Sequence, residues 1–237
     1  MSADTKTVDV ESFEYVDRAL YLPDRDVLAV SDLHVGIERA AHDRGVAMPL
    51  MEAENLERDL RALVEAYSPS EVVFNGDVHH EFGSLGDDGD VIRRLESAVE
   101  SHGAEAVFVE GNHDTMLDSV VETKPYHEVD GVVFVHGDRV PVDLPDAPLY
   151  VVGHDHPAVE VEMQKTACYL YGPCGDGRVL MTPAFNELCR GVVVNQMRAS
   201  DFMSPFVRPP LDDFSVVVEV DGEVLWFPRI GEFRGLL

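Results

Sequence analysis

The sequence predicts an α/β fold in which two packed β-sheets are flanked by helices, and three observations indicate it. The first half of the chain alternates β-type apolar runs with segments of helical periodicity. The second half consists mainly of short β-type runs separated by Gly, Pro and Asp. The length of 237 residues and the apolar fraction of 45% are sufficient for a real hydrophobic core. We therefore expect one domain spanning residues 1–237.

The first half has a β-α-β-α-β order. Its expected elements, in chain order, are Val27–Val30, Met51–Tyr67, Glu71–Phe74, Val91–Val99 and Ala106–Val109. Apolar residues at helical spacing support the first helix, and a proline follows shortly after its end. This alternation is typical of a largely parallel sheet whose strands are connected by helices.

The second half is expected to supply mainly strands. The β-type runs are Val132–Val135, Tyr150–Val152, Ala158–Met163, Cys168–Tyr171, Val179–Met181, Val192–Val194, Val216–Val220 and Val224–Phe227. Asp221-Gly222 lies between the last two runs and predicts a two-residue hairpin turn. Residues 196–213 are interpreted as a long connection, with a lid or an oligomer contact as alternatives.

The composition is strongly acidic, with 45 Asp and Glu against 18 Lys and Arg and a net charge of -27. Such a charge repels nucleic acid and anionic membranes in dilute salt. One interpretation is simple solubility. We favour the other, a cytoplasmic protein of a halophilic cell, because molar salt shortens the screening length to about 3 Å. The acidic surface then says little about the substrate.

Neither a membrane span nor a disulfide framework is expected. No apolar run approaches the ~18–20 residues that a span needs, and the polar N-terminal segment does not resemble a signal peptide. Cys168, Cys174 and Cys189 form no C-x-x-C pair and are interpreted as reduced thiols. We expect a cytoplasmic protein without a membrane partner; a homo-oligomer is compatible with the sequence.

Five short motifs carry the chemistry of the chain, and four of them directly follow a β-type run. In order they are Asp32-Leu33-His34, Gly76-Asp77, Gly111-Asn112-His113-Asp114, His136-Gly137 and Gly153-His154-Asp155-His156. The end of a strand is a rigid place for a metal ligand, and together the motifs offer enough donors for two ions. Mixed carboxylate, carboxamide and imidazole donors favour Mn, Fe, Zn, Co or Ni over Ca.

Two such ions suit the hydrolysis of a phosphate ester. Cations about 3.5–4 Å apart can activate a hydroxide, clamp the phosphate oxygens and neutralise developing charge. A histidine that is not a ligand can then donate a proton to the leaving oxygen. His113 is the candidate for this catalytic role, and Asp114 is a candidate for orienting it.

The series of motifs resembles the calcineurin-like metallophosphoesterase superfamily. The resemblance runs from Asp32 to His156, about half of the chain, and departs from the pattern in Val135-His136-Gly137 and at Asp155. It implies a four-layer sandwich of two mixed β-sheets flanked by helices, with the dinuclear metal centre at the strand ends. It also implies the roles of the ligands. The first ion would be held by Asp32, His34 and His156, the second by Asn112, His136 and His154, with Asp77 bridging the two.

A narrower likeness covers more of the chain. Ser31–Gly36, Gly76–Phe82, Pro183–Asn186 and Asp221–Leu225 resemble small prokaryotic members, which include archaeal predicted phosphoesterases and DNA-ligase-associated metallophosphoesterases. In nucleases of the superfamily, a histidine at the position of His80 approaches the scissile phosphate, so His80 is a candidate substrate-binding residue. Phe185 and Asn186 are interpreted as a packed turn, with pocket lining as the alternative.

The sequence therefore predicts a metal-dependent phosphoric ester hydrolase with two divalent ions, manganese being the first choice. A phosphodiester, nucleotide or nucleic acid is the favoured substrate. A phosphomonoesterase or protein phosphatase is the alternative within the same fold. A non-catalytic metal-binding scaffold is the alternative from another class; it is disfavoured because every ligand position is filled and His113 is present.

Overall fold

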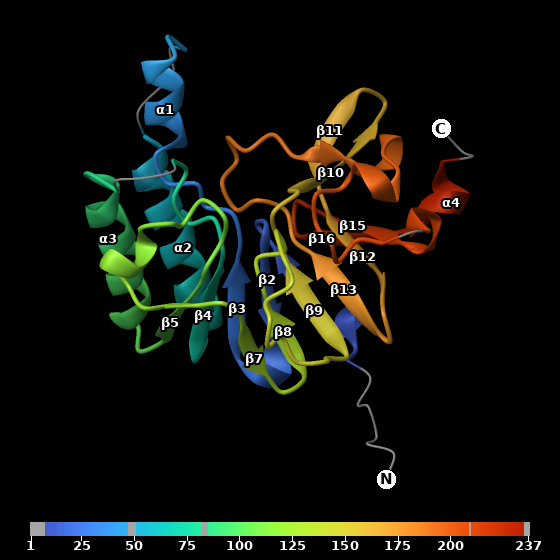
Figure 1. Ribbon diagram of the computed structural model, residues 1–237, viewed down its shortest axis with the longest axis horizontal. Coiled ribbons are helices and arrows are strands. Elements are labelled where there is room, and N and C mark those ends of the chain that lie inside the picture. Colours follow the sequence, from blue (N-terminus) through green and yellow to red (C-terminus); the bar gives the residue numbers. More distant parts are fainter. Residues whose placement is uncertain (1–7, 47–50, 82–84, 209, 235–237) are drawn as a thin grey trace.

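The computed structural model describes residues 8–46, 51–81, 85–208 and 210–234, and two large β-sheets packed face to face form its centre (Figure 1). The first sheet has the strand order β1-β2-β3-β4-β5-β6. Its strands are β1 (Glu14–Val16), β2 (Ala19–Leu22), β3 (Val27–Val30), β4 (Glu71–Asn75), β5 (Glu105–Val109) and β6 (Thr123–Lys124). The strands β3, β4, β5 and β6 run parallel, whereas β1 and β2 form an antiparallel hairpin at one edge.

The second sheet has the order β16-β15-β12-β13-β9-β8-β7 and is also mixed. Its strands, in chain order, are β7 (His127–Val129), β8 (Val132–Phe134), β9 (Leu149–Val152), β12 (Tyr169–Cys174), β13 (Gly177–Met181), β15 (Ser215–Val220) and β16 (Glu223–Arg229). The strands β8, β9 and β13 are parallel neighbours, so the carboxyl ends of β8 and β9 meet at one edge. A small third sheet has the order β11-β10-β14, with β10 (Pro157–Val161), β11 (Gln164–Ala167) and β14 (Val192–Val193).

The outer layers of the sandwich differ from each other. The α-helices are α1 (Ile37–Asp43), α2 (Glu52–Tyr67), α3 (Asp88–Glu100) and α4 (Ile230–Phe233). The helices α2 and α3 cover the outer face of the first sheet (Figure 1). The second sheet is covered instead by residues 194–208 and 210–214, with the short 3₁₀ turns η4 (Val194–Gln196), η5 (Ala199–Asp201) and η6 (Leu211–Asp213), and by α4. Three further 3₁₀ turns are η1 (Val10–Ser12), η2 (Pro23–Arg25) and η3 (Leu117–Ser119).

The hydrophobic core fills the space between the two large sheets and also covers the outer face of each sheet. Apolar side chains from both sheets, such as Val73, Val107, Phe134 and Val151, form the layer between them. Both faces of the strands are buried, which is why β3 and β8 consist of consecutive apolar residues. The long apolar layer between the sheets fixes their relative position and therefore the distance between motifs that follow β3 and β8.

The fold class predicted from the sequence is confirmed. The two mixed sheets and the flanking helices are present, and Asp221 and Gly222 form the expected hairpin turn with φ of 53° and 80°. The run Ala158–Met163 was predicted too long, because β10 ends at Val161 and Glu162 and Met163 form the turn to β11. None of the helices in the described part of the chain is long and apolar enough to cross a bilayer.

Residues 196–213, of which 209 lies outside the described residues, pack as a covering segment on the second sheet. Phe202, Phe206 and Leu211 are buried there in one cluster with residues of β12 and β15. The predicted connecting segment thus also has a structural role, because its residues form the outer layer in place of a helix.

Candidate metal centre

The five motifs lie at the carboxyl ends of β3, β4, β5, β8 and β9, and the packing of the two sheets brings these ends together. Backbone hydrogen bonds connect the motifs directly. The N–H of Asp32 donates to the Gly76 carbonyl at 3.0 Å, and the N–H of Gly153 donates to the His136 carbonyl at 2.8 Å. The motifs are therefore adjacent loops of one rigid edge rather than separate surface turns.

The backbone of the centre is unusual. The candidate ligands Asp32, His34, Asp77, His154 and His156 all have φ between 46° and 74°, a region that non-glycine residues rarely adopt. Such conformations cost about 1–3 kcal/mol each and cluster at functional sites. The surrounding hydrogen bonds and packing must therefore hold these loops in place, and they direct the side chains to a common point.

Close approach explains the glycine before Asp77. Gly76 has a φ of 82°, and a Cβ at this position would overlap the ring of His136. A side chain at residue 76 would displace one of the candidate ligands, so the Gly-Asp motif has a steric as well as a conformational reason.

The first group of donors comprises Asp32, His34, Asp77 and His156. The ligand atoms of Asp32, His34 and Asp77 lie within 4.8 Å of one another. The Nε2 atoms of His34 and His156 face each other at 3.3 Å, and His156 Nε2 lies 3.3 Å from Asp32 Oδ1. The Asp32 carboxylate also accepts the N–H of His154 at 3.1 Å, which fixes its orientation.

The second group comprises Asp77, Asn112, His136 and His154. His136 Nε2 lies 3.2 Å from Asn112 Oδ1, 3.2 Å from His154 Nδ1 and 3.4 Å from Asp77 Oδ2. The ligand atoms of Asp77, His136 and His154 again lie within 4.8 Å of one another. Asp77 is thus the residue common to both groups.

The buried charges of the centre balance one another. Burial alone would raise the pKa of Asp32 and Asp77, but neighbouring imidazoles, His156 for Asp32 and His136 for Asp77, outweigh it and lower both pKa values. Burial lowers the pKa of His34 to about 4. For His136, burial is outweighed by Asp77 and Asp32, which raise its pKa to about 9. The carboxylates therefore remain charged in a site from which water is largely excluded.

The donor set fits divalent cations. Imidazole nitrogens face each other in pairs, with carboxylate oxygens and a carboxamide oxygen beside them. The Nδ1 atom of His136 is buried without a hydrogen-bond partner among the described residues, so this ring is not held by an ordinary hydrogen-bond network at both nitrogens. Oxygen and imidazole donors in this mixture suit transition-metal ions.

His113 and His80 lie beside the first group. His113 Nδ1 donates to the His80 carbonyl oxygen, and its Nε2 lies 3.9 Å from Asp77 Oδ2. The ring of His80 approaches the same place, with its Nδ1 3.3 Å from His34 Nδ1. Burial, followed by the neighbouring His113, lowers the pKa of His80. Ligand atoms of His34, His80 and His113 lie within 4.8 Å of one another.

Asp114 is buried and accepts hydrogen bonds from the backbone. Its carboxylate accepts the N–H groups of His79 and Gly111 at 2.9 Å each and of Val78 at 3.3 Å. It thereby ties the loop after β4 to the loop after β5. The contact that orients the His113 ring at Nδ1 comes instead from a backbone carbonyl, that of His80.

Asp155, the departure in the last motif, points away from the ligands. Its carboxylate accepts the N–H groups of Met203 at 3.0 Å and Ser204 at 2.9 Å. Asp155, which stands between His154 and His156 in the chain, therefore anchors the covering segment of the second sheet. His79 likewise turns away from the centre, since its Nε2 lies 3.2 Å from Asp88 Oδ2 at the start of α3.

One residue near the ligands was not predicted to belong to the site. The thiol of Cys189 lies within 4.8 Å of the ligand nitrogens of His34 and His156. No sequence motif marks it, and the three cysteines are free thiols of unequal burial. Only the folded chain places this loop at the centre.

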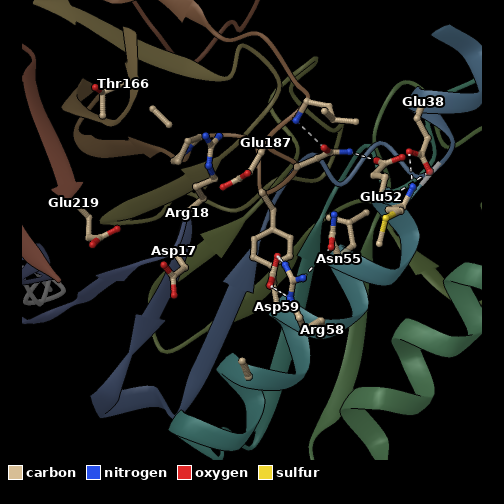
Figure 2. Close-up of a pocket in the computed structure, with 18 of the residues that line it drawn as sticks. Asp17, Arg18, Glu38, Glu52, Asn55, Arg58, Asp59, Thr166, Glu187 and Glu219 are labelled. Atoms are coloured by element: carbon tan, nitrogen blue, oxygen red, sulfur yellow. Dashed lines mark hydrogen bonds and ion pairs between the residues drawn. The ribbon is translucent and has the colours of Figure 1, made fainter. Parts of the chain in front are cut away.

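A cavity of about 760 Å³ lies next to the metal centre, but none of the seven candidate ligands is among its described lining residues. Glu38 of α1 and Glu52 of α2 lie side by side at one end of it (Figure 2). Asn186 also lines this cavity, and its Nδ2 donates to Glu52 Oε1 and, at 2.8 Å, to the Leu33 carbonyl between Asp32 and His34. The turn at Asn186 therefore connects the cavity to the first motif.

Comparisons with known proteins concern the family and the fold of the chain. Residues 26–141 match the profile of the calcineurin-like phosphoesterase family. A solved structure, described as the nuclease MPE of Pseudomonas putida, has the same fold: the TM-score is 0.61 and the identity 19%, and the match covers 89% of this chain and 92% of that chain. No curated protein matches the chain.

The fold, the motif order and the family match together establish the class of protein. Residues 26–141 form a calcineurin-like phosphoesterase domain, and the chain has the metallophosphoesterase fold. Members of this class are phosphoesterases, and the family implies divalent metal ions at a site such as the one formed by these Asp and His clusters.

Proposed function

We propose that this protein is a phosphodiesterase that binds two divalent ions and hydrolyses nucleotides or nucleic acid. The observation that carries the proposal is the position of Asp77, which belongs to both groups of donors, Asp32–His34–Asp77 and Asp77–His136–His154. A carboxylate has two oxygens and can therefore connect two ions. When bound, a pair of divalent ions supplies neutralisation of phosphate charge and a more acidic water molecule.

The protein's own residues supply position and protons. The first ion would be held by Asp32, His34 and His156, the second by Asn112, His136 and His154. His113 would carry a proton on Nε2 and deliver it to the leaving oxygen, while Nδ1 remains fixed by the His80 carbonyl. Asp114 would act as a positioning residue, because its carboxylate holds the backbone on both sides of this loop.

The choice of a diester rests on three supports. The ring of His80 lies beside His34 and His113, where it could contact a phosphate oxygen. The similar solved structure is described as a nuclease. The motifs also resemble a subgroup that includes DNA-ligase-associated enzymes. A phosphomonoesterase remains the alternative, and substrate rates decide between them.

The decisive experiment measures metal content and substrate preference of the purified protein. The chain would be freed of metal, reloaded with Mn²⁺, Co²⁺, Ni²⁺ or Zn²⁺, and assayed on bis-p-nitrophenyl phosphate, p-nitrophenyl phosphate, cyclic nucleotides and single-stranded DNA. We expect two ions per chain, manganese as an activating ion and faster turnover of diesters. Faster turnover of monoesters would overturn the diester choice, and two bound ions without turnover of any ester would favour a non-catalytic scaffold.

These assays should be carried out at high salt concentration. The net charge of -27 repels polyanionic substrates in dilute buffer, and molar KCl reduces the screening length to about 3 Å. We infer that the protein is adapted to the cytoplasm of a halophilic cell and that its melting temperature rises with KCl. A melting temperature that falls steadily with added KCl would contradict this inference.

A further inference from the structure

The loop after β13 places a thiol beside two of the candidate ligands of the first group. The Cys189 thiol and the ligand nitrogens of His34 and His156 lie within 4.8 Å of one another. The same His34 belongs to the group formed with Asp32 and Asp77. Cys189 therefore lies beside two of the candidate ligands of the first group and is not an isolated thiol.

The loop that carries Cys189 is fixed from its amino-terminal side by Asn186. The N–H of Cys189 donates to the Asn186 carbonyl at 3.1 Å, and the N–H of Leu188 donates to Asn186 Oδ1 at 2.9 Å. The Asn186 side chain in turn donates to the Leu33 carbonyl at 2.8 Å. Because Leu33 separates Asp32 from His34, the turn that carries the thiol is tied to the motif that carries two ligands.

The loop is also fixed from its carboxyl-terminal side, at His156. The N–H of Val192 donates to the His156 carbonyl at 2.9 Å. Gly191 lies so close to this carbonyl that a Cβ there would overlap its oxygen. The thiol is thus held between contacts to both of the motifs that supply His34 and His156, which leaves little freedom for the Cys189 loop.

We propose that Cys189 binds the first metal ion as a thiolate, together with Asp32, His34, Asp77 and His156. The proposal rests on the metal centre described under the proposed function and adds a ligand that the five motifs do not contain. On binding, the Sγ–H bond breaks, an Sγ–metal bond forms and the proton is released to the buffer. A soft sulfur ligand favours Zn²⁺ and Co²⁺ over Mn²⁺, so this position would be more selective for these ions than oxygen and imidazole donors alone.

The test uses the full chain, freed of metal by a chelator and titrated with CoCl₂. We expect an intense near-ultraviolet thiolate-to-cobalt charge-transfer band in addition to the visible bands of Co²⁺. The band should disappear in Cys189→Ser and in Cys189→Ala, and the affinity for Zn²⁺ should fall by roughly tenfold or more while that for Mn²⁺ changes less. Cys174→Ser is the matched control, because Cys174 lies on β12 and outside the candidate ligand clusters of the described residues; it should keep the band.

A measurement without any substitution protects the test against variants that fail to fold. Iodoacetamide labelling of the unaltered protein, read by mass spectrometry, should be slowed at Cys189 by Zn²⁺ and unchanged at Cys174. Two bound Co²⁺ ions without the charge-transfer band, or a band that persists in Cys189→Ser, would overturn the thiolate ligand and leave the proposed function intact. Failure of the chain to bind any divalent ion would overturn both.

Discussion

In two neighbouring clusters of buried carboxylates, the pKa values are shifted in opposite directions. In the metal centre, imidazoles surround Asp32 and Asp77 and outweigh burial, so both pKa values are lowered. At the end of the adjacent cavity, burial and the nearby Glu38 raise the pKa of Glu52 to about 8. The comparison shows that burial alone does not determine the charge of a carboxylate; the partners within a few ångströms do.

The two clusters are physically connected. The Asn186 side chain donates both to Glu52 and to the Leu33 carbonyl of the first motif. Glu38 accepts the N–H groups of Met51 and Glu52 at 3.0 Å each, which satisfies donors at the start of α2. One cluster therefore has the donors of a cation site, while the other fixes a helix end and a turn.

The largest expected effect comes from Asp77→Asn. This change keeps the shape of the side chain but removes the charge shared by both donor groups. We expect loss of both ions and a fall in activity of roughly 10³-fold or more, since the bound ions supply several kcal/mol of charge stabilisation. Elemental analysis and diester turnover measure the two effects. Glu52→Gln is the matched control in the other cluster and should keep both ions; an Asp77→Asn protein that retains two ions would remove Asp77 from its bridging role.

A smaller effect is expected for His113→Ala. The proposed proton donor is lost, but no ligand is, so turnover should fall by about 10²–10⁴-fold while metal content stays the same. Turnover and metal content are measured on the same preparation. His102→Ala, an exposed histidine that contacts Ala98 and Glu65, serves as the control. Unchanged turnover in His113→Ala would remove this residue from catalysis.

The smallest expected effect is the pH-dependent stability of Glu52→Gln. The folded-state pKa of Glu52, about 8, lies above its ordinary value of 4.5, so the folded state binds the proton more tightly than the unfolded chain. Ionising Glu52 therefore lowers the free energy of unfolding. This loss of stability is absent below pH 4.5, grows between pH 4.5 and 8 and is constant above pH 8. The glutamine removes it, so Glu52→Gln should melt at a higher temperature at pH 8 and at nearly the same temperature at pH 4.5.

Thermal melting of both proteins across this pH range measures the effect. A gain of about 1 kcal/mol corresponds to a rise of roughly 2–4 °C in a chain of this size. A difference in melting temperature that does not change with pH would show that folding does not raise the pKa of Glu52.

Most of the fold was predictable because its strands are buried on both faces. Consecutive apolar residues at Val27–Val30 and Val132–Phe134 mark such strands without any knowledge of their neighbours. The hairpin of β1 and β2 was missed, since its strands are short and its turn, Asp17-Arg18, has no glycine although φ is 42° and 66°. The single-domain organisation stays a prediction.

For the site, the sequence by itself determined which residues could bind metal and the order in which they follow the strands. That much is local, because a polar ligand directly after an apolar strand is visible in the chain. The bridging role of Asp77 was already implied by the family resemblance of the motifs. Only the tertiary structure decided that Asp114 accepts backbone N–H groups and that Cys189 lies beside His34. These relations depend on how two sheets pack and on which loops then meet, and no pattern within one segment records such contacts between distant residues.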